Sequence, residues 1–237
     1  MSKNYTTDAI NINSYNLSES DKIIVMYSKE HGIIRAVAKG VKKPKSKLSG
    51  RMDMLIANNL VLVKGRNLDI VSQAEVLHNF KNLRIDINKL SFSMYCAELV
   101  SVFGIENDFN SEIIYNLLVD TLEKINSTAG KSNILAHVLD FQMQLMDIVG
   151  YKIALNNCAC CFKPYDKNFG FSMQGGGVIC PSCGQNHAFS AEVIEVFKNP
   201  FDCQNLALLE KSFNILKDFI SFHSQRKIKS LNFLECI

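Results

Sequence analysis

The chain has 237 residues, of which 47% are hydrophobic and 21% charged, so it can bury a sizeable core. This length exceeds the usual size of one domain, and we expect two or three compact units. No apolar run reaches the roughly 18 to 20 residues that span a bilayer, and the polar N-terminal segment lacks the apolar region of a signal peptide. These features argue against a membrane partner and predict a cytoplasmic protein.

Positive charge is concentrated in one segment, although the net charge is only +3. Seven of the 26 Lys and Arg lie between His31 and Met52, where no acidic residue occurs. These seven residues are Arg35, Lys39, Lys42, Lys43, Lys45, Lys47 and Arg51. Cations at this density neutralise phosphates, so the segment predicts nucleic-acid binding without base recognition. A solvated charge run or a localisation signal is the alternative interpretation.

Apolar residues recur with a period of two in residues 5 to about 78, as in β-strands. Ile23, Val25 and Tyr27 follow this period, and the segment 33–39 continues it with one apolar and one basic face. Residues 60–72 read as a hairpin. Five short antiparallel strands favour a closed barrel of the OB type for residues 1–80, with a flexible basic loop; an open sheet or an SH3-like barrel is the alternative.

The period becomes helical from about residue 86. Segments 88–103 and 111–126 predict two helices, and an apolar stripe from Ile134 to Ile148 predicts a third that ends at Gly150. A similar stripe runs from Leu206 to His223. We interpret these stripes as the buried faces of one helical domain, formed by residues 81–156 and 189–237. The predicted class is therefore α+β, an OB-fold barrel followed by an α-helical domain.

Residues 157–188 interrupt the helical pattern and show no periodic apolar face, so we expect a constraint other than burial to hold them. Two C-x-x-C pairs, Cys158 with Cys161 and Cys180 with Cys183, are separated by 18 residues. This spacing is typical of tetrahedral zinc, and a hairpin between the pairs would bring them together. Four protein ligands leave no position for water, so the segment predicts one structural zinc ion and no catalysis at it.

The remaining cysteines allow other interpretations. A redox C-x-x-C would need a βαβ setting that this segment lacks. Cys160 and His187 lie beside the two pairs and are alternative zinc ligands. The isolated cysteines, Cys96, Cys203 and Cys236, are expected to be buried small residues.

An OB barrel typically binds single strands in a basic groove where aromatic rings stack on bases. Tyr15, Tyr27 and Phe80 are the candidate stacking residues, with burial in the core as the alternative. Arg66, in the turn of the predicted hairpin, completes the candidate DNA-binding set. The chain has no P-loop, dinucleotide fingerprint, G-x-S-x-G or H-E-x-x-H motif, which favours a binding protein over an enzyme.

In combination, these parts resemble the bacterial RecO family over nearly the whole chain. The residues that carry the resemblance are Ser20–Ile24, His31–Gly40, Gly50–Arg51, Gly65–Glu75, Ala97–Val100, Leu145–Tyr151, the two cysteine pairs and Phe219–Leu234.

The resemblance implies a recombination mediator with an OB domain, a helical domain and an inserted zinc knuckle. It implies binding to single- and double-stranded DNA, strand annealing, and work with RecR and, in some bacteria, RecF. It also implies help in loading RecA onto strands coated by single-stranded DNA-binding protein, through the C-terminal tail of that protein. The basic residues from Arg35 to Arg51 match the basic OB segment of the family, and a nucleoid-associated cytoplasmic location is expected.

Three functions are therefore compared. The first is a DNA-binding and annealing mediator that is not an enzyme. The second is a zinc-containing scaffold that recruits repair proteins and contacts DNA only indirectly. The third is a zinc-dependent nucleic-acid enzyme, which a closed four-thiolate site disfavours.

Overall fold

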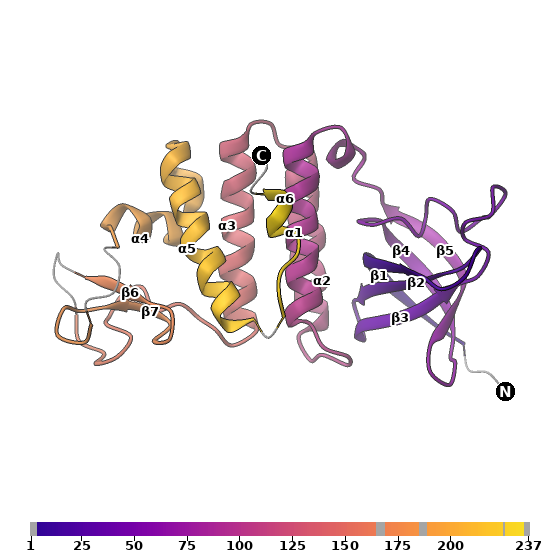
Figure 1. The fold of residues 1–237 in the computed structure, drawn as a ribbon, viewed down its shortest axis with the longest axis horizontal. Helices are drawn as coiled ribbons and strands as arrows, with labels where there is room; N and C mark the ends of the chain where they lie inside the picture. Colours follow the sequence, from indigo (N-terminus) through magenta and orange to yellow (C-terminus); the bar gives the residue numbers. More distant parts are fainter. Residues whose placement is uncertain (1–3, 165–168, 185–188, 225, 235–237) are drawn as a thin grey trace. The chain divides into compact units, whose positions relative to one another are not determined.

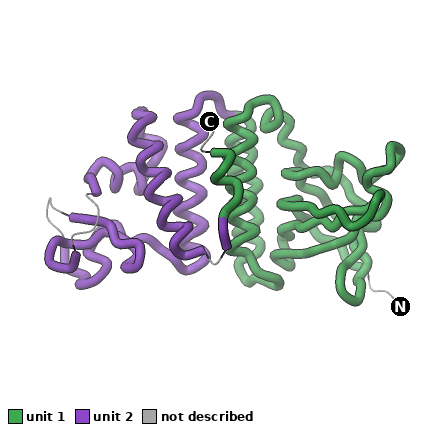
Figure 2. The backbone as a smooth tube through the Cα atoms, in the orientation of Figure 1, with its two compact units in different colours: residues 1–127, 228–237 green, residues 128–227 purple. Residues whose placement is uncertain are grey.

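The computed structural model describes residues 4–164, 169–184, 189–224 and 226–234 (Figure 1). The chain divides into two compact units, residues 1–127 with 228–237 and residues 128–227 (Figure 2). The finer division at residues 80, 156 and 188 remains a prediction. Among the described residues, none of the helices has the combination of length and apolar character needed to cross a bilayer.

The first unit begins with a closed five-stranded barrel. Its strands are β1 (Asn4–Asn16), β2 (Lys22–Ser28), β3 (Gly32–Ala38), β4 (Ala57–Val63) and β5 (Asp69–His78). They follow the order β1-β2-β3-β5-β4 around the barrel. Neighbouring strands are antiparallel except β3 and β5, which pair in parallel where Ala36 faces Asp69 and Val37 faces Ile70. This architecture confirms the predicted OB-type barrel.

The inside of the barrel differs in one respect from the predicted alternation. In β2 the residues packed in the barrel core are Ile24 and Met26. They alternate along the strand with the residues of the predicted period, which are Ile23, Val25 and Tyr27. Tyr27 is nevertheless fully buried. The strand is therefore apolar on both faces, because helical segments of the same unit cover its outer face. The simple apolar–polar alternation predicted for β2 is wrong for this reason.

The barrel is followed by a short 3-10 helix η1 (Lys81–Arg84) and helices α1 (Ile87–Phe103) and α2 (Ser111–Ser127), and α6 (Leu231–Leu234) completes the unit. Asp86 caps α1, accepting hydrogen bonds from the amides of Asn88 and Lys89. The predicted helices 88–103 and 111–126 are confirmed to within one residue at each end.

The loop between α1 and α2 lies against the turn between β2 and β3. The Ile33 amide donates to the Ile105 carbonyl at 3.0 Å, and the Asn107 amide donates to the His31 carbonyl at 2.7 Å. Gly32 has φ +63°, and a Cβ there would lie 2.2 Å from the Ile105 carbonyl oxygen. Only glycine permits both this backbone conformation and this close approach.

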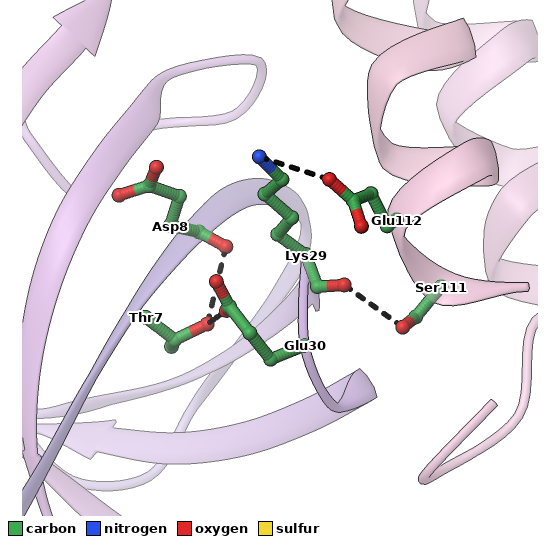
Figure 3. Close-up of polar contacts among 6 residues, drawn as sticks. All are labelled: Thr7, Asp8, Lys29, Glu30, Ser111 and Glu112. Atoms are coloured by element: carbon green, nitrogen blue, oxygen red, sulfur yellow. Dashed lines mark hydrogen bonds and ion pairs between the residues drawn. The ribbon is translucent and has the colours of Figure 1, made fainter. Parts of the chain in front are cut away.

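Side chains extend the same junction towards α2 (Figure 3). Lys29 Nζ forms an ion pair with Glu112 Oε1 at 3.2 Å, and Ser111 Oγ donates to the Lys29 carbonyl at 2.8 Å. The Thr7 hydroxyl donates to the Glu30 carboxylate beside them. The barrel and the first two helices are therefore joined by hydrogen bonds as well as by apolar packing.

The second unit contains α3 (Lys131–Ile148), β6 (Gly170–Ser172), β7 (Gly177–Ile179), α4 (Ala191–Lys198), the 3-10 helix η2 (Pro200–Asp202) and α5 (Leu206–His223). The stripe predicted from Ile134 is buried through Leu145, and Gly150 follows α3 with φ +89°. Helix α4 was not predicted, because eight residues are too short to display a helical period.

The segment around the cysteines has more apolar burial than we expected. Phe171, Val178, Ile179 and Phe189 are each at most 6% exposed. The Phe171 ring packs edge-on against Phe219 of α5, with centroids 5.9 Å apart. Burial therefore contributes here in addition to the predicted constraint, because single aromatic residues of an irregular segment reach the helices without forming a periodic face.

Candidate metal centre and candidate nucleic-acid interface

Four cysteine sulfurs converge in the second unit. The Sγ atoms of Cys158, Cys161, Cys180 and Cys183 all lie within 4.8 Å of one another, and those of Cys161 and Cys180 are 3.8 Å apart. Sulfurs bound tetrahedrally to one zinc ion at about 2.3 Å lie about 3.8 Å from one another. The cluster that the spacing predicts is therefore assembled and could hold a metal ion.

The hairpin of β6 and β7 positions both cysteine pairs. Cys180 follows β7 directly, and the residues before Cys158 run alongside β7 through a parallel bridge between Ala154 and Gly177. The Ala159 amide donates to the Val178 carbonyl at 2.7 Å. A Cβ at position 177 would lie 2.4 Å from the Ala154 carbonyl oxygen, so a glycine is required for this approach.

The protonation chemistry of the cluster fits a bound cation. Hydrogen bonds from the backbone amides of Cys161 and Cys180 lower the pKa of the Cys158 thiol to about 6. The sulfurs of Cys180 and Cys161 raise the pKa of Cys183 to about 12, because its thiol proton is shared with them. A divalent cation at the centre would replace that proton and neutralise the crowded thiolates.

The other cysteines that the structure describes lie outside the cluster. Cys160 is exposed, and a Cβ at Gly175 would lie 3.5 Å from its Sγ, so its thiol lies near the tip of the hairpin. Cys96 is fully buried as expected. Cys203 is partly exposed, contrary to expectation, and its thiol donates to the Asn205 carbonyl at 3.6 Å. Cys236 and His187 lie outside the described residues.

The basic segment between β3 and β4 is a succession of turns. The Lys43 amide donates to the Gly40 carbonyl at 3.1 Å, and the Ser46 amide donates to the Lys43 carbonyl at 3.0 Å. Val41 and Met52, near its two ends, are buried in the barrel core. We expected a flexible loop, but these turns and anchors constrain the backbone that carries the cations.

Arg51 has a structural role as well. Its carbonyl oxygen accepts hydrogen bonds from the side-chain amides of Asn11 at 2.8 Å and Asn58 at 2.9 Å, and its guanidinium donates to the Ala74 carbonyl at 2.8 Å. These contacts fix the end of the basic segment on β1, β4 and β5. Arg51 therefore orders the segment in addition to supplying charge.

A groove of about 630 Å³ lies between this end of the basic segment and strands β4 and β5. Lys47 and Arg51 form one side, and Asn59, Gln73 and Glu75 are among the strand residues on the other. Sequence reasoning missed the strand side, because isolated polar residues on an exposed strand face have no distinctive spacing.

The eight predicted DNA-binding residues are all exposed, but they do not form one cluster. Lys47 and Arg51 share the groove, whereas Lys42 Nζ donates to the Ser18 carbonyl at 2.9 Å. Arg35 lies on β3 and forms an ion pair with Glu106 in the α1–α2 loop. The remaining residues are exposed in the segment itself or in the β4–β5 turn: Lys39, Lys43, Lys45 and Arg66.

Two of the three candidate stacking residues are unavailable. Tyr27 is fully buried and Phe80 is 4% exposed, so neither ring can receive a base; the core interpretation is correct for both. The Tyr27 hydroxyl donates to Asp108 at 3.2 Å, which accounts for the burial of its polar end. Tyr15, at 55% exposure, is accessible.

Together these features define an α+β protein of the OB-barrel class with an exposed cationic segment on the barrel and, in a second unit, a four-cysteine cluster that could hold a metal ion. Comparison with known proteins makes the assignment specific. Residues 1–80 match the family model for the N-terminal part of recombination protein O, and residues 84–232 match the model for its C-terminal part. The chain belongs to the RecO family.

Individual relatives agree with this assignment. The chain is 31% identical over 249 residues to the DNA repair protein RecO of Pelotomaculum thermopropionicum, covering 98% of this chain and 94% of that protein. It is 33% identical over 196 residues to the protein of the same name from Gloeothece citriformis, covering 80% and 69% respectively. The corresponding protein of Nostoc punctiforme is 34% identical over 189 residues, covering 76% and 63%.

Proposed function

We propose that this protein is a DNA repair and recombination mediator that binds single- and double-stranded DNA and anneals complementary strands. The observation that carries the proposal is the exposed cationic segment, held by buried anchors on an OB-type barrel, in a chain of the RecO family. Relatives named DNA repair proteins support the same role.

In this proposal the barrel contacts DNA mainly through the phosphates. Lys43 and Lys45, on the turns, and Lys47 and Arg51, beside the groove, would neutralise phosphates and release counterions. Such contacts carry no sequence information, which suits a protein that must act on any broken DNA. A backbone held by turns and buried anchors favours binding, because less loop entropy is lost on contact.

We propose that the four-cysteine cluster holds one zinc ion. Bound zinc would cross-link the two cysteine pairs, and four thiolate ligands would leave no coordination position for a reacting water. The metal therefore has a structural role in this proposal, and the protein is a binding protein without catalytic turnover.

The proposed partners follow from family membership. They are RecR, RecF and the C-terminal tail of single-stranded DNA-binding protein, and the proposed outcome is loading of RecA onto strands coated by that protein. A cytoplasmic, nucleoid-associated location accords with these partners.

The proposal is tested by annealing two complementary strands that have been coated with single-stranded DNA-binding protein, with and without RecR. We expect annealing to be faster with this protein than without it, and RecR to change that rate. Equal annealing in the presence and absence of the protein, on bare and coated strands alike, would contradict the mediator role.

One observation favours the scaffold function as a second candidate. Ile105, Phe109 and Ile113, in the α1–α2 loop and the start of α2, are 62%, 104% and 55% exposed. Large apolar side chains exposed within one short stretch of chain are candidates for a protein-interaction site. If the scaffold function were the main one, replacing Phe109 with Ser would abolish partner binding while the affinity for naked DNA, if any, stayed unchanged.

A further inference from the structure

A second cavity of the first unit lies away from the groove beside the basic segment. It has a volume of about 400 Å³ and is lined by segments that are distant in sequence: β1, the β2–β3 turn with β3, the β4–β5 turn and the α1–α2 loop. This volume falls in the range of about 300–1,000 Å³ that is usual for small-molecule sites.

The walls of this cavity are fixed by backbone contacts. The hydrogen bonds between the β2–β3 turn and the α1–α2 loop hold one side. On the other side, a Cβ at Gly65 would lie 1.9 Å from the Leu68 carbonyl oxygen, so the β4–β5 turn closes tightly on itself. A cavity built in this way is present before any ligand arrives, which lowers the entropic cost of binding.

Two aromatic rings form a corner of the cavity. The rings of Tyr5 and His31 meet at 90° with centroids 5.2 Å apart. Ile33 and Leu68 add apolar surface to the lining. Lys64 Nζ lies over the Tyr5 ring, 5.5 Å from its centroid, so a flat, unsaturated ligand in this corner would stack mainly on His31. Such ring contacts are favourable beyond the area they bury.

Charged groups in the cavity are already paired. Arg35 is paired with Glu106, and Lys64 Nζ lies 3.3 Å from Asp69 Oδ2. The Tyr5 hydroxyl donates to the same Asp69 carboxylate at 2.5 Å. Since each cation has an acidic partner, the cavity is a poor site for a free anion. It instead offers hydrogen-bond donors and acceptors to the polar edge of a neutral ring.

We propose that this cavity receives one unstacked base of a bound single strand, with the base lying in the corner between Tyr5 and His31. This inference rests on the proposed DNA-binding function and adds a contact to the base, which the basic segment does not supply. Arg35, one of the candidate DNA-binding residues, lines the same cavity, so the cavity adjoins the proposed DNA-binding surface.

The proposal is tested with the zinc-loaded full-length protein and two dye-labelled single strands of equal length, one oligothymidine and one in which every nucleotide is abasic. Both have the same phosphate backbone. We expect the intact strand to bind about 5- to 150-fold more tightly, because stacking of one base on an aromatic side chain contributes on that scale. His31→Ala should remove most of this difference, and His31→Phe should restore it.

Two control variants separate base contact from charge. Lys43→Ala should weaken binding of both strands by the same factor, and Phe222→Ala, which removes an exposed ring from α5 in the second unit, should leave the difference between strands in place. Thermal unfolding of each variant, compared with that of wild type, tests whether the fold is kept. The proposal is overturned if wild type binds both strands equally, or if Phe222→Ala and not His31→Ala removes the difference. If neither strand binds at all, the proposed DNA-binding function itself fails.

Discussion

Ser111 Oγ donates a hydrogen bond to the Lys29 carbonyl oxygen at 2.8 Å, linking the first turn of α2 to the turn between β2 and β3 (Figure 3). Ser111 is 5% exposed, so water cannot readily replace the bond. The contact joins a helix to a turn of the barrel that is 82 residues away in sequence. It makes the barrel and the first two helices one structural unit.

Replacing Ser111 with Ala should therefore destabilise the first unit by about 1–3 kcal/mol, because a buried carbonyl loses its donor. Urea unfolding would measure the change. Ser127→Ala is the matched control, since its hydroxyl bonds to the Glu123 carbonyl within the same helix at an exposed position. A control that costs as much as Ser111→Ala would show that the junction contributes nothing.

Gly32→Ala should be more damaging than a substitution at an ordinary positive-φ glycine. Both Gly32 and Gly50 have positive φ, +63° and +71°, but a Cβ at Gly50 meets nothing within 4 Å. We expect Gly50→Ala to cost about 1 kcal/mol and Gly32→Ala at least twice that, because the new Cβ collides with the Ile105 carbonyl. Equal losses of unfolding free energy in the two variants would contradict the close approach between the turn and the loop.

Cys158→Ser should lower the zinc content from one ion per chain to nearly none and destabilise the second unit by more than about 3 kcal/mol, because metal binding contributes directly to folding. Metal analysis and thermal unfolding measure the two effects. Cys160→Ser is the control and should keep its zinc, since the Cys160 thiol lies outside the cluster. A Cys158→Ser protein that kept metal and fold but lost annealing would move the knuckle from a structural role to a DNA-binding one.

Asp69 should make the first unit less stable in acid. Burial alone would raise its pKa, but hydrogen bonds from the Tyr5 hydroxyl, the Gly65 amide and Lys64 outweigh that effect and hold the pKa below its usual value. A lowered folded-state pKa gives stability that is complete above the unfolded value of about 3.9 and is lost as the pH falls through the folded value.

The measurement for Asp69 is the unfolding free energy of wild type and Asp69→Asn at pH 7 and at pH 3. We expect the difference between the two proteins to be larger at pH 7 than at pH 3. Tyr5→Phe, which keeps the ring and removes the hydroxyl donor, should show a smaller change of the same sign. A difference that does not depend on pH would contradict the inferred charge on Asp69.

Structure could be predicted best where the spacing of residues along the chain has a single physical cause. The cysteine pairs could be predicted because two thiolates of a C-x-x-C turn converge on one ion, and the cluster has the expected members. The helices α1, α2, α3 and α5 could be predicted because a buried helical face repeats every three or four residues.

The remaining features depend on contacts between distant segments. Tyr27 carries an aromatic ring that could stack on a base. It is buried in the fold, however, and its hydroxyl donates a hydrogen bond to Asp108 of the α1–α2 loop. The corner between Tyr5 and His31 could not be predicted, since 26 residues separate them and only the closed barrel brings them together. The same holds for the strand side of the groove at Gln73.

The central claim is that the cations of the basic segment bind DNA phosphates directly. The affinity for a single strand should be measured over a salt series for wild type and for the variant in which Lys42, Lys43, Lys45 and Lys47 are all replaced by Ala. Its control replaces four exposed lysines elsewhere with Ala: Lys81, Lys124, Lys152 and Lys211.

We predict that the logarithm of the binding constant falls steeply with the logarithm of salt concentration for wild type and for the control. Each phosphate contact contributes a slope of about −0.7 on single strands, so loss of the four lysines should flatten the line by up to roughly 3. A variant whose slope and affinity match those of wild type would contradict the account, because the basic segment would then not be where the protein holds DNA.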